Sequence, residues 1–242
     1  MPNFLFLAAI CLLVAASILL ETEASPKPDK KREKGPSSGN AEPKAGQPPQ
    51  NQWDSAAAAC QKGLTLSSDQ LIVEFTGKKS DHRSVRAEWP IPTGNSGIFY
   101  YEVTILEKKD DYAIYIGLAT KKLPKDHVGF DEGTYGYGSL GNFWGYDAER
   151  CSRYVCENDG RHYIEGKPKF GEGNVVGCGV DLKSRKIIFT KNGVLLETAD
   201  WSVADSAGDL YPCVTLYEPG TKIEANFGPE NFRFDIAKAF EN

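Results

Sequence analysis

The sequence lacks the residue arrangements that most catalytic sites need. Its 3 histidines, His82, His127 and His162, lie in separate polar segments, and none forms a recognisable pair with a cysteine or serine nucleophile. The glycine-rich segment 171–177 leads into a predicted strand and not into a helix, so it does not match a phosphate-binding loop. Segment 137–141 lacks the glycine that a nucleophile elbow carries two residues before its serine. We therefore expect no enzyme activity and no cofactor.

Positively charged residues are also fewer than negatively charged ones. The chain has 28 Lys and Arg against 33 Asp and Glu, a net charge of −5. Residues 1–52 hold 6 of the basic and 5 of the acidic side chains, which leaves a net charge of −6 on residues 53–242. A nucleic-acid-binding protein needs a dense positive face and, for single strands, aromatic stacking platforms. We expect no nucleic-acid partner.

Glycosylation acceptors are absent, and the cysteines do not pair completely. No Asn-X-Ser or Asn-X-Thr occurs, and after Cys11 in the N-terminal run five cysteines remain, an odd number for an extracellular disulfide framework. Cys178 and Cys213 lie in apolar segments and are predicted to be buried core thiols. Cys151 and Cys156 lie in a polar loop and could pair or stay reduced. Because no second cysteine pair has ligand spacing, we expect no metal site.

The N-terminus is predicted to be a secretory signal peptide, residues 1–24. Residues 4–20 are uncharged and almost wholly apolar, and the small residues Thr22 and Ala24 occupy the two positions that a signal peptidase reads. Cleavage then falls between Ala24 and Ser25, leaving no membrane segment. The alternative is an uncleaved membrane anchor, because the apolar run approaches the length that spans a bilayer.

Residues 25–52 have the composition of a disordered linker, rich in Pro, Gly, Ser, Lys and Gln. Asp29 and Glu33 interrupt the basic cluster 27–34, which favours a solvated linker, and nuclear targeting is the alternative. Residues 53–242 have the length of one domain.

The pattern in residues 53–242 is that of an all-β protein. Segments 64–66 and 71–75 predict a hairpin, and segments 99–106, 112–118, 175–182 and 187–191 are rich in β-branched and aromatic residues. Asn192-Gly193 is a strong hairpin turn. Short helices are predicted only near residues 55–60, with Asp54 as N-cap, and near residues 236–240. Two packed antiparallel sheets are expected.

These segments resemble the SPRY family, in particular SPRY domains of Ran-binding-protein-M type. The resemblance rests on segments that occur in the family's order: 84–87, 90–92, 97–103, 116–119, 134–137, 175–182, 187–193, 210–216 and 225–228. It implies a SPRY-type β-sandwich that binds proteins through its loops.

The combination of signal peptide, Pro/Lys linker and SPRY domain resembles the secreted SPRY effectors (SPRYSEC family) of plant-parasitic nematodes. That resemblance implies a monomer that is secreted and delivered into the host-cell cytoplasm, or onward to the nucleus. Its partner would be a host protein, such as an intracellular immune receptor or its regulator, and binding would modulate plant immunity. The alternative is an extracellular or membrane-tethered SPRY adaptor with an endogenous partner.

The resemblance also implies a binding surface formed by three loops, which we expect to converge on one face. Tyr217 stands where peptide-binding SPRY domains have tryptophan, so ligand identity does not transfer. Tyr and Arg are favoured anchors at interfaces, and a rigid scaffold commonly carries its binding residues on loops. The candidate residues are Lys78, Lys79, Asp81, His82 and Arg83 in the first loop; Thr120, Lys121, Pro124, His127, Val128 and Phe130 in the second; and Leu216, Tyr217 and Glu218 in the third.

Processing at the predicted cleavage position can be measured directly. Expressed in a eukaryotic cell, the chain should be exported with Ser25 as its first residue, because the apolar run ends in a peptidase site. N-terminal sequencing of the secreted protein checks this. Recovery of intact Met1 in the membrane fraction would instead establish the anchored form.

Overall fold

The computed structural model describes residues 50–109, 113–146, 161–198, 201–204, 208–228 and 230–240. These residues belong to one compact unit, Gln47–Asn242. The predicted signal peptide, its cleavage position at Ala24 and Ser25, residues 25–49 of the linker, and Cys151 and Cys156 lie outside the described residues. Within the described ranges, no helix has the length and apolar character needed to cross a membrane.

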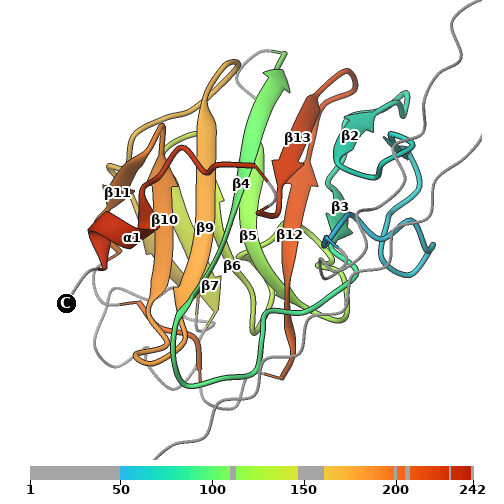
Figure 1. Cartoon of the computed structure of the whole chain (residues 1–242). Helices are drawn as coiled ribbons and strands as arrows, with labels where there is room; N and C mark the ends of the chain where they lie inside the picture. Colours follow the sequence, from blue (N-terminus) through green and yellow to red (C-terminus); the bar gives the residue numbers. More distant parts are fainter. Residues whose placement is uncertain are drawn as a thin grey trace, which may run out of the picture. The chain divides into compact units, whose positions relative to one another are not determined.

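Two antiparallel sheets pack face to face, as the sequence predicts (Figure 1). The larger sheet has the order β1-β2-β13-β4-β9-β10-β11. Its strands are β1 (Leu64–Leu66), β2 (Ile72–Phe75), β4 (Ile98–Glu107), β9 (Val175–Asp181), β10 (Ile187–Lys191), β11 (Val194–Leu196) and β13 (Lys222–Asn226).

The second sheet has six strands in the order β3-β12-β5-β6-β7-β8. Its strands are β3 (Arg83–Arg86), β5 (Tyr115–Thr120), β6 (Tyr135–Gly138), β7 (Asn142–Tyr146), β8 (Arg161–Ile164) and β12 (Leu210–Leu216). Every residue of β12 is buried, which shows that both faces of this strand are covered. The core lies under one face, and the chain between β5 and β6 lies over the other.

Large side chains from both sheets form the core. Trp53, Phe75, Tyr101 and Phe143 are almost completely buried, and burying a side chain of this kind is worth about 1.5–3 kcal/mol. The Tyr101 hydroxyl, on β4, donates to the Gly117 carbonyl oxygen on β5 at 2.6 Å. One buried side chain thus links the two sheets and satisfies its own polar atom.

The predicted turn at Asn192-Gly193 is confirmed. It joins β10 to β11, with Lys191 paired to Val194, and both turn residues have positive φ, 49° and 79°. Asparagine and glycine tolerate this conformation better than other residues, which is why the pair is a reliable sequence signal.

One predicted helix forms and the other does not. Helix α1 (Ile236–Ala239) follows Asp235, whose side chain accepts a hydrogen bond from the Lys238 amide. Residues 55–60 form only a single turn, so the helix predicted there is wrong. Cys60 instead forms an antiparallel β-bridge with Val85 of β3. This tertiary pairing overrides the helix propensity of the alanines at residues 56–59.

The C-terminal segment covers the outer face of the seven-stranded sheet. Its anchor is Glu102 on β4, which is 4% exposed and accepts hydrogen bonds from the amides of Arg233 at 2.8 Å and Phe234 at 3.0 Å. The Tyr100 hydroxyl donates to the same carboxylate at 2.9 Å, and the ring of Phe232 packs against the Tyr100 ring. The outer face of the six-stranded sheet is covered instead by the chain between β5 and β6, where Val128 packs with Ala119 and Cys213.

The three described cysteines should differ in reactivity. Cys178 and Cys213 are 0% exposed, and burial raises the pKa of both thiols, so little thiolate is available. Cys60 is half-buried and should react first with iodoacetamide in the folded protein. A labelling time course with peptide mass mapping measures the three rates. Equal rates for Cys60 and Cys178 would contradict the burial of β9.

Candidate functional site

Three segments far apart in the sequence meet where β3, β12 and β5 lie side by side. Register places Arg83, the first residue of β3, opposite Leu216 at the end of β12, and Thr215 opposite Tyr115 at the start of β5. The loop before β3 and the loop after β12 therefore leave the sheet at the same end. The Asp81 amide donates to the Tyr217 carbonyl at 3.0 Å, and Ser80 Oγ donates to Glu218 at 2.5 Å.

Aromatic rings fill the junction between these loops. The His82 ring lies 4.9 Å from the Tyr217 ring, 5.4 Å from the His127 ring and 6.0 Å from the Tyr115 ring, measured between centroids. His127 stacks on Tyr115 with centroids 3.7 Å apart and planes 4° apart. Phe130 packs against His127 at 5.2 Å. We call the surface formed by His82, Asp126, Phe130 and Tyr217 the loop face.

A buried threonine holds the junction together. Thr215 Oγ1, on β12, accepts from the Val128 amide at 3.0 Å and shares a hydrogen bond with Ser84 Oγ on β3 at 2.8 Å. Thr215, Ser84 and Val128 are all 0% exposed. The Thr215 hydroxyl thus joins β12, which precedes Tyr217, to β3, which follows His82, and to the second loop, which carries His127. Sequence reasoning missed Thr215 and Ser84, because Ser and Thr within strands give no distinctive signal.

Close backbone contact presses the second loop onto the sheet. A Cβ atom at Gly136 of β6 would lie 2.3 Å from the Val128 carbonyl oxygen. A Cβ atom at Gly129, where φ is 98°, would lie 2.7 Å from Cβ of Trp144. Glycine at both positions is therefore required for residues 128 and 129 to lie directly on β6 and β7.

Burial disfavours the charged form of both described histidine rings and so lowers the pKa of each. It lowers the pKa of His127 to about 4, although the Val128 carbonyl and Asp126 oppose that shift. It also lowers the pKa of His82, against the opposing carboxylates of Asp126 and Asp81; His82 Nδ1 lies 2.5 Å from Asp126 Oδ1. The loop face is therefore aromatic at its centre, and Asp126 is its acidic member.

Several of the predicted binding residues lie beneath the loop face, between it and the sheet. Leu216 and Val128 are 0% exposed, Pro124 is buried, and His127 is 5% exposed, so these four side chains do not present surface to a partner. The sequence analysis placed all four among the binding-loop residues. The second loop lies across the sheet, so its apolar members face inward and cover β5 and β12.

Thr120 and Lys121 are not brought to the loop face. Thr120 is the last residue of β5 and pairs with Leu210, about 17 Å along the strand from Tyr115 at the usual rise per residue. The Lys121 carbonyl accepts from Arg86 Nε at the same end. The three loops thus converge around the predicted residues His82, His127 and Tyr217. Thr120 and Lys121 lie at the far end of β5, and Lys78 and Lys79 line a separate groove.

Lys78, Lys79 and Arg83 line a separate groove on the other side of the first loop. Its volume is about 540 Å³, and Phe75 and Gly77 contribute to its floor. Asp81 is exposed and lies 2.7 Å from Arg83 Nη1. The first loop therefore has an aromatic side, facing Tyr217, and a basic side.

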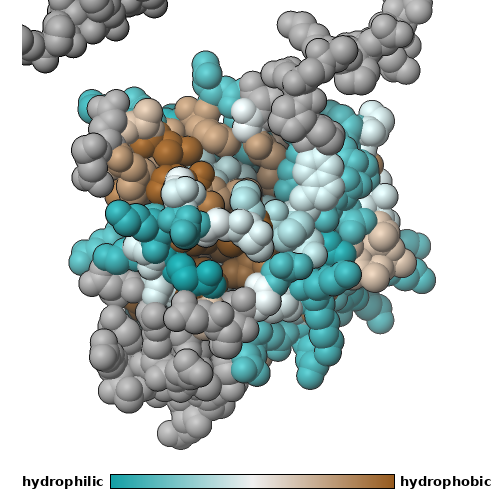
Figure 2. All heavy atoms as spheres, turned by 60° about the horizontal axis from the view of Figure 1, so that its bottom comes forward, coloured by the Kyte–Doolittle hydropathy of each residue, from teal (hydrophilic) through white to brown (hydrophobic). Residues whose placement is uncertain are grey.

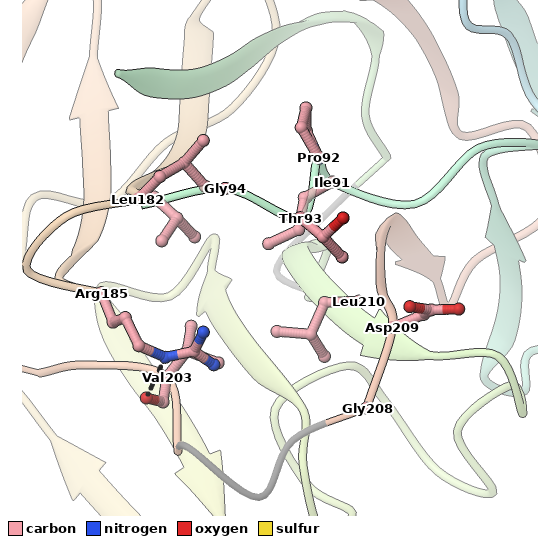
Figure 3. A pocket seen from close by; sticks show the side chains of 11 residues that line it. Ile91, Pro92, Thr93, Gly94, Leu182, Arg185, Val203, Gly208, Asp209 and Leu210 are labelled. Atoms are coloured by element: carbon pink, nitrogen blue, oxygen red, sulfur yellow. Dashed lines mark hydrogen bonds between the residues drawn. The ribbon is translucent and has the colours of Figure 1, made fainter. Parts of the chain in front are cut away.

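A further pocket, of about 390 Å³, lies at the opposite end of the sandwich, where β12 begins and β9 ends. Figure 2 looks onto this end, where hydrophobic residues show between hydrophilic ones. Figure 3 shows Leu182 and Leu210 within the pocket and Arg185 at its edge, where Arg185 donates to the Val203 carbonyl. Residues 205–207, between Val203 and Gly208, lie outside the described residues.

The two described histidine rings of the site lie among aromatic and backbone groups. His82 and His127 contact aromatic rings, Asp126 and the Val128 carbonyl. No group of three or more His, Cys, Asp or Glu in the described ranges could hold a metal ion. The arrangement forms a rigid aromatic surface at one end of strands β3, β12 and β5.

Sequence comparison gives the family to which this two-sheet fold belongs. Residues 98–230 match the SPRY domain, so the chain belongs to the SPRY family, whose members are generally non-catalytic interaction domains. It is 36% identical over 191 residues to Ran-binding protein 9 of Xenopus laevis, covering 78% of this chain and 32% of that protein. It is 37% identical over 177 residues to human Ran-binding protein 9, covering 72% of this chain and 22% of that protein. The chain thus spans a third or less of the length of these relatives.

Solved structures agree on the fold. A human SPRY domain superposes with a TM-score of 0.55 at 19% identity, covering 70% of this chain and 98% of that one. The SPRY domain of human HERC1 gives a TM-score of 0.54 at 18% identity, covering 74% and 99%.

The buried neutral His127 predicts a pH dependence of stability. The unfolded state binds a proton at this residue below about pH 6.5, whereas the folded state does so only near pH 4. Between these values the unfolded state holds more protons, so the free energy of unfolding falls as the pH is lowered, by up to about 3 kcal/mol from this residue. Urea denaturation at pH 7, 6, 5 and 4 measures the loss.

His127→Phe is the matched variant, because phenylalanine retains a ring over Tyr115 but cannot take up a proton. Its stability should fall less steeply over the same pH range than that of the parent. Parallel pH profiles for parent and variant would contradict the assignment.

Proposed function

We propose that this protein is a secreted, non-catalytic SPRY effector that binds a host protein through the loop face. The observation that carries the binding proposal is the convergence of His82, Asp126, Phe130 and Tyr217 from three separate loops onto one rigid edge of the sheet. Aromatic side chains held in place lose little entropy on binding, which makes them effective anchors.

The N-terminal sequence supports secretion. Residues 4–20 are apolar, Ala24 ends a peptidase-like site, and the linker that follows would tether the domain flexibly. Reduced, buried Cys178 and Cys213 and the absence of a glycosylation acceptor suit a cytosolic destination after export. Delivery into a host plant cell, action on an immune receptor or its regulator, and membership of the nematode SPRYSEC family remain parts of this proposal.

The second candidate is an extracellular or membrane-tethered adaptor with an endogenous partner. The similarity to Ran-binding protein 9 favours it, because those relatives are animal proteins and not parasite effectors by name. The two candidates differ in where the mature chain accumulates. Immunolocalisation in infected and uninfected tissue separates them.

Tyr217→Ala tests the loop face. If Tyr217 is an anchor, the variant should lose about 2 kcal/mol of binding free energy, roughly 30-fold in Kd, toward a partner captured by the mature chain. Trp89→Ala is the matched control, since Trp89 is 39% exposed and lies outside the loop face. Replacing Lys30 and Lys31 in the linker should also leave the affinity nearly unchanged.

Calorimetry gives the affinities, and a thermal melt of each variant checks that it is folded. A Tyr217→Ala protein that melts and binds like the parent would remove this loop from the binding surface.

A further inference from the structure

The groove beside the first loop is bordered by cationic side chains. Lys62, Lys78, Lys79 and Arg83 line it around Phe75, within a volume of about 540 Å³. We call it the basic groove. It lies in a unit that is otherwise acidic, with a net charge of −6 on residues 53–242. The four cationic side chains therefore make the basic groove a locally positive region on a domain of net negative charge.

Backbone contacts build the floor of the basic groove. The Gly63 carbonyl accepts from the amides of Thr76 at 2.8 Å and Gly77 at 3.0 Å, which ties the segment before β1 to the loop after β2. A Cβ atom at Gly77 would lie 2.4 Å from the Phe75 ring, and φ of Gly63 is 103°. Glycine at both positions lets the two segments lie against the aromatic ring, so the floor is rigid.

The charges on the groove are mostly uncompensated. Within the described part of the chain, Lys62, Lys78 and Lys79 form no ion pair, and Arg83 pairs only with the exposed Asp81. Like charges held near one another repel, and a bound anion relieves that repulsion. The groove therefore favours a ligand that carries several negative charges.

We propose that the basic groove binds an acidic segment of the partner protein. The proposal rests on the function proposed above, since the same first loop borders both surfaces: its Asp81 amide bonds the Tyr217 carbonyl on one side and its Lys78 and Lys79 border the groove on the other. A partner that contacts Tyr217 can thus extend its chain into the groove. A nucleic acid fits less well, because its backbone needs a positive face that continues beyond one groove.

The test is an NMR titration of the ¹⁵N-labelled mature chain with hexaglutamate. The largest amide shift changes should fall at Gly63, Gly77 and their neighbours. Lys78→Glu/Lys79→Glu should weaken hexaglutamate binding at least about tenfold, the sum of two modest ion-pair losses and their reversal. The matched pair Lys183→Glu/Lys238→Glu, also exposed and outside the groove, should bind within about twofold of the parent. The spectrum of each free variant shows that it is folded.

Three results of the hexaglutamate experiments would overturn the proposal: shift changes absent or scattered over other surfaces, equal weakening by both lysine pairs, or tighter binding of hexathymidylate than of hexaglutamate. Tyr217→Ala separates this inference from the proposed function, because it should still bind hexaglutamate normally. If the chain binds hexaglutamate but no partner binds at the loop face, only the proposed function is contradicted. If Lys78→Glu/Lys79→Glu leaves the affinity for the partner unchanged, only the proposed role of the basic groove is contradicted.

Discussion

The loop face depends on the buried hydroxyl of Thr215. Its hydrogen bonds to the Val128 amide and the Ser84 hydroxyl lie in the interior, where an unsatisfied polar group costs about 1–3 kcal/mol. The three segments must therefore stay together for these groups to remain paired. His127 can then stack on Tyr115, and His82 can reach Tyr217. The surface is positioned by the sheet and not by the loops alone.

This arrangement explains why one sandwich carries two different surfaces beside each other. The C-terminal segment, held by Glu102, covers the outer face of the seven-stranded sheet, and the second loop covers much of the six-stranded sheet. The first loop is accessible at the Tyr217 end, with aromatic rings on one side and lysines on the other. A partner there would meet an aromatic anchor site next to a cationic groove, a combination that gives both affinity and orientation.

The sequence predicts the fold well because its strand and turn signals are local. The β-branched and aromatic residues of β4 and the Asn192-Gly193 turn need no distant partner to be recognised, and the strand and the turn are both present. The site is harder to predict, since it depends on register and on which loop residues face inward. The positions of polar residues along the sequence do not show that Val128 and Leu216 are buried. They also do not show that Lys121 lies at the far end of β5. Alanines at residues 56–59 favoured a helix, but pairing of Cys60 with Val85 decided the outcome.

Amide hydrogen exchange in Thr215→Val tests the central claim most directly. Valine keeps the shape of threonine but cannot accept the Val128 amide, so exchange should accelerate at Val128 and in residues 80–83 and 126–130, while β9 and β10 keep their protection. Unchanged protection at Val128 and in both loops would contradict the account, because it would show that the loop face holds its form without the Thr215 hydroxyl.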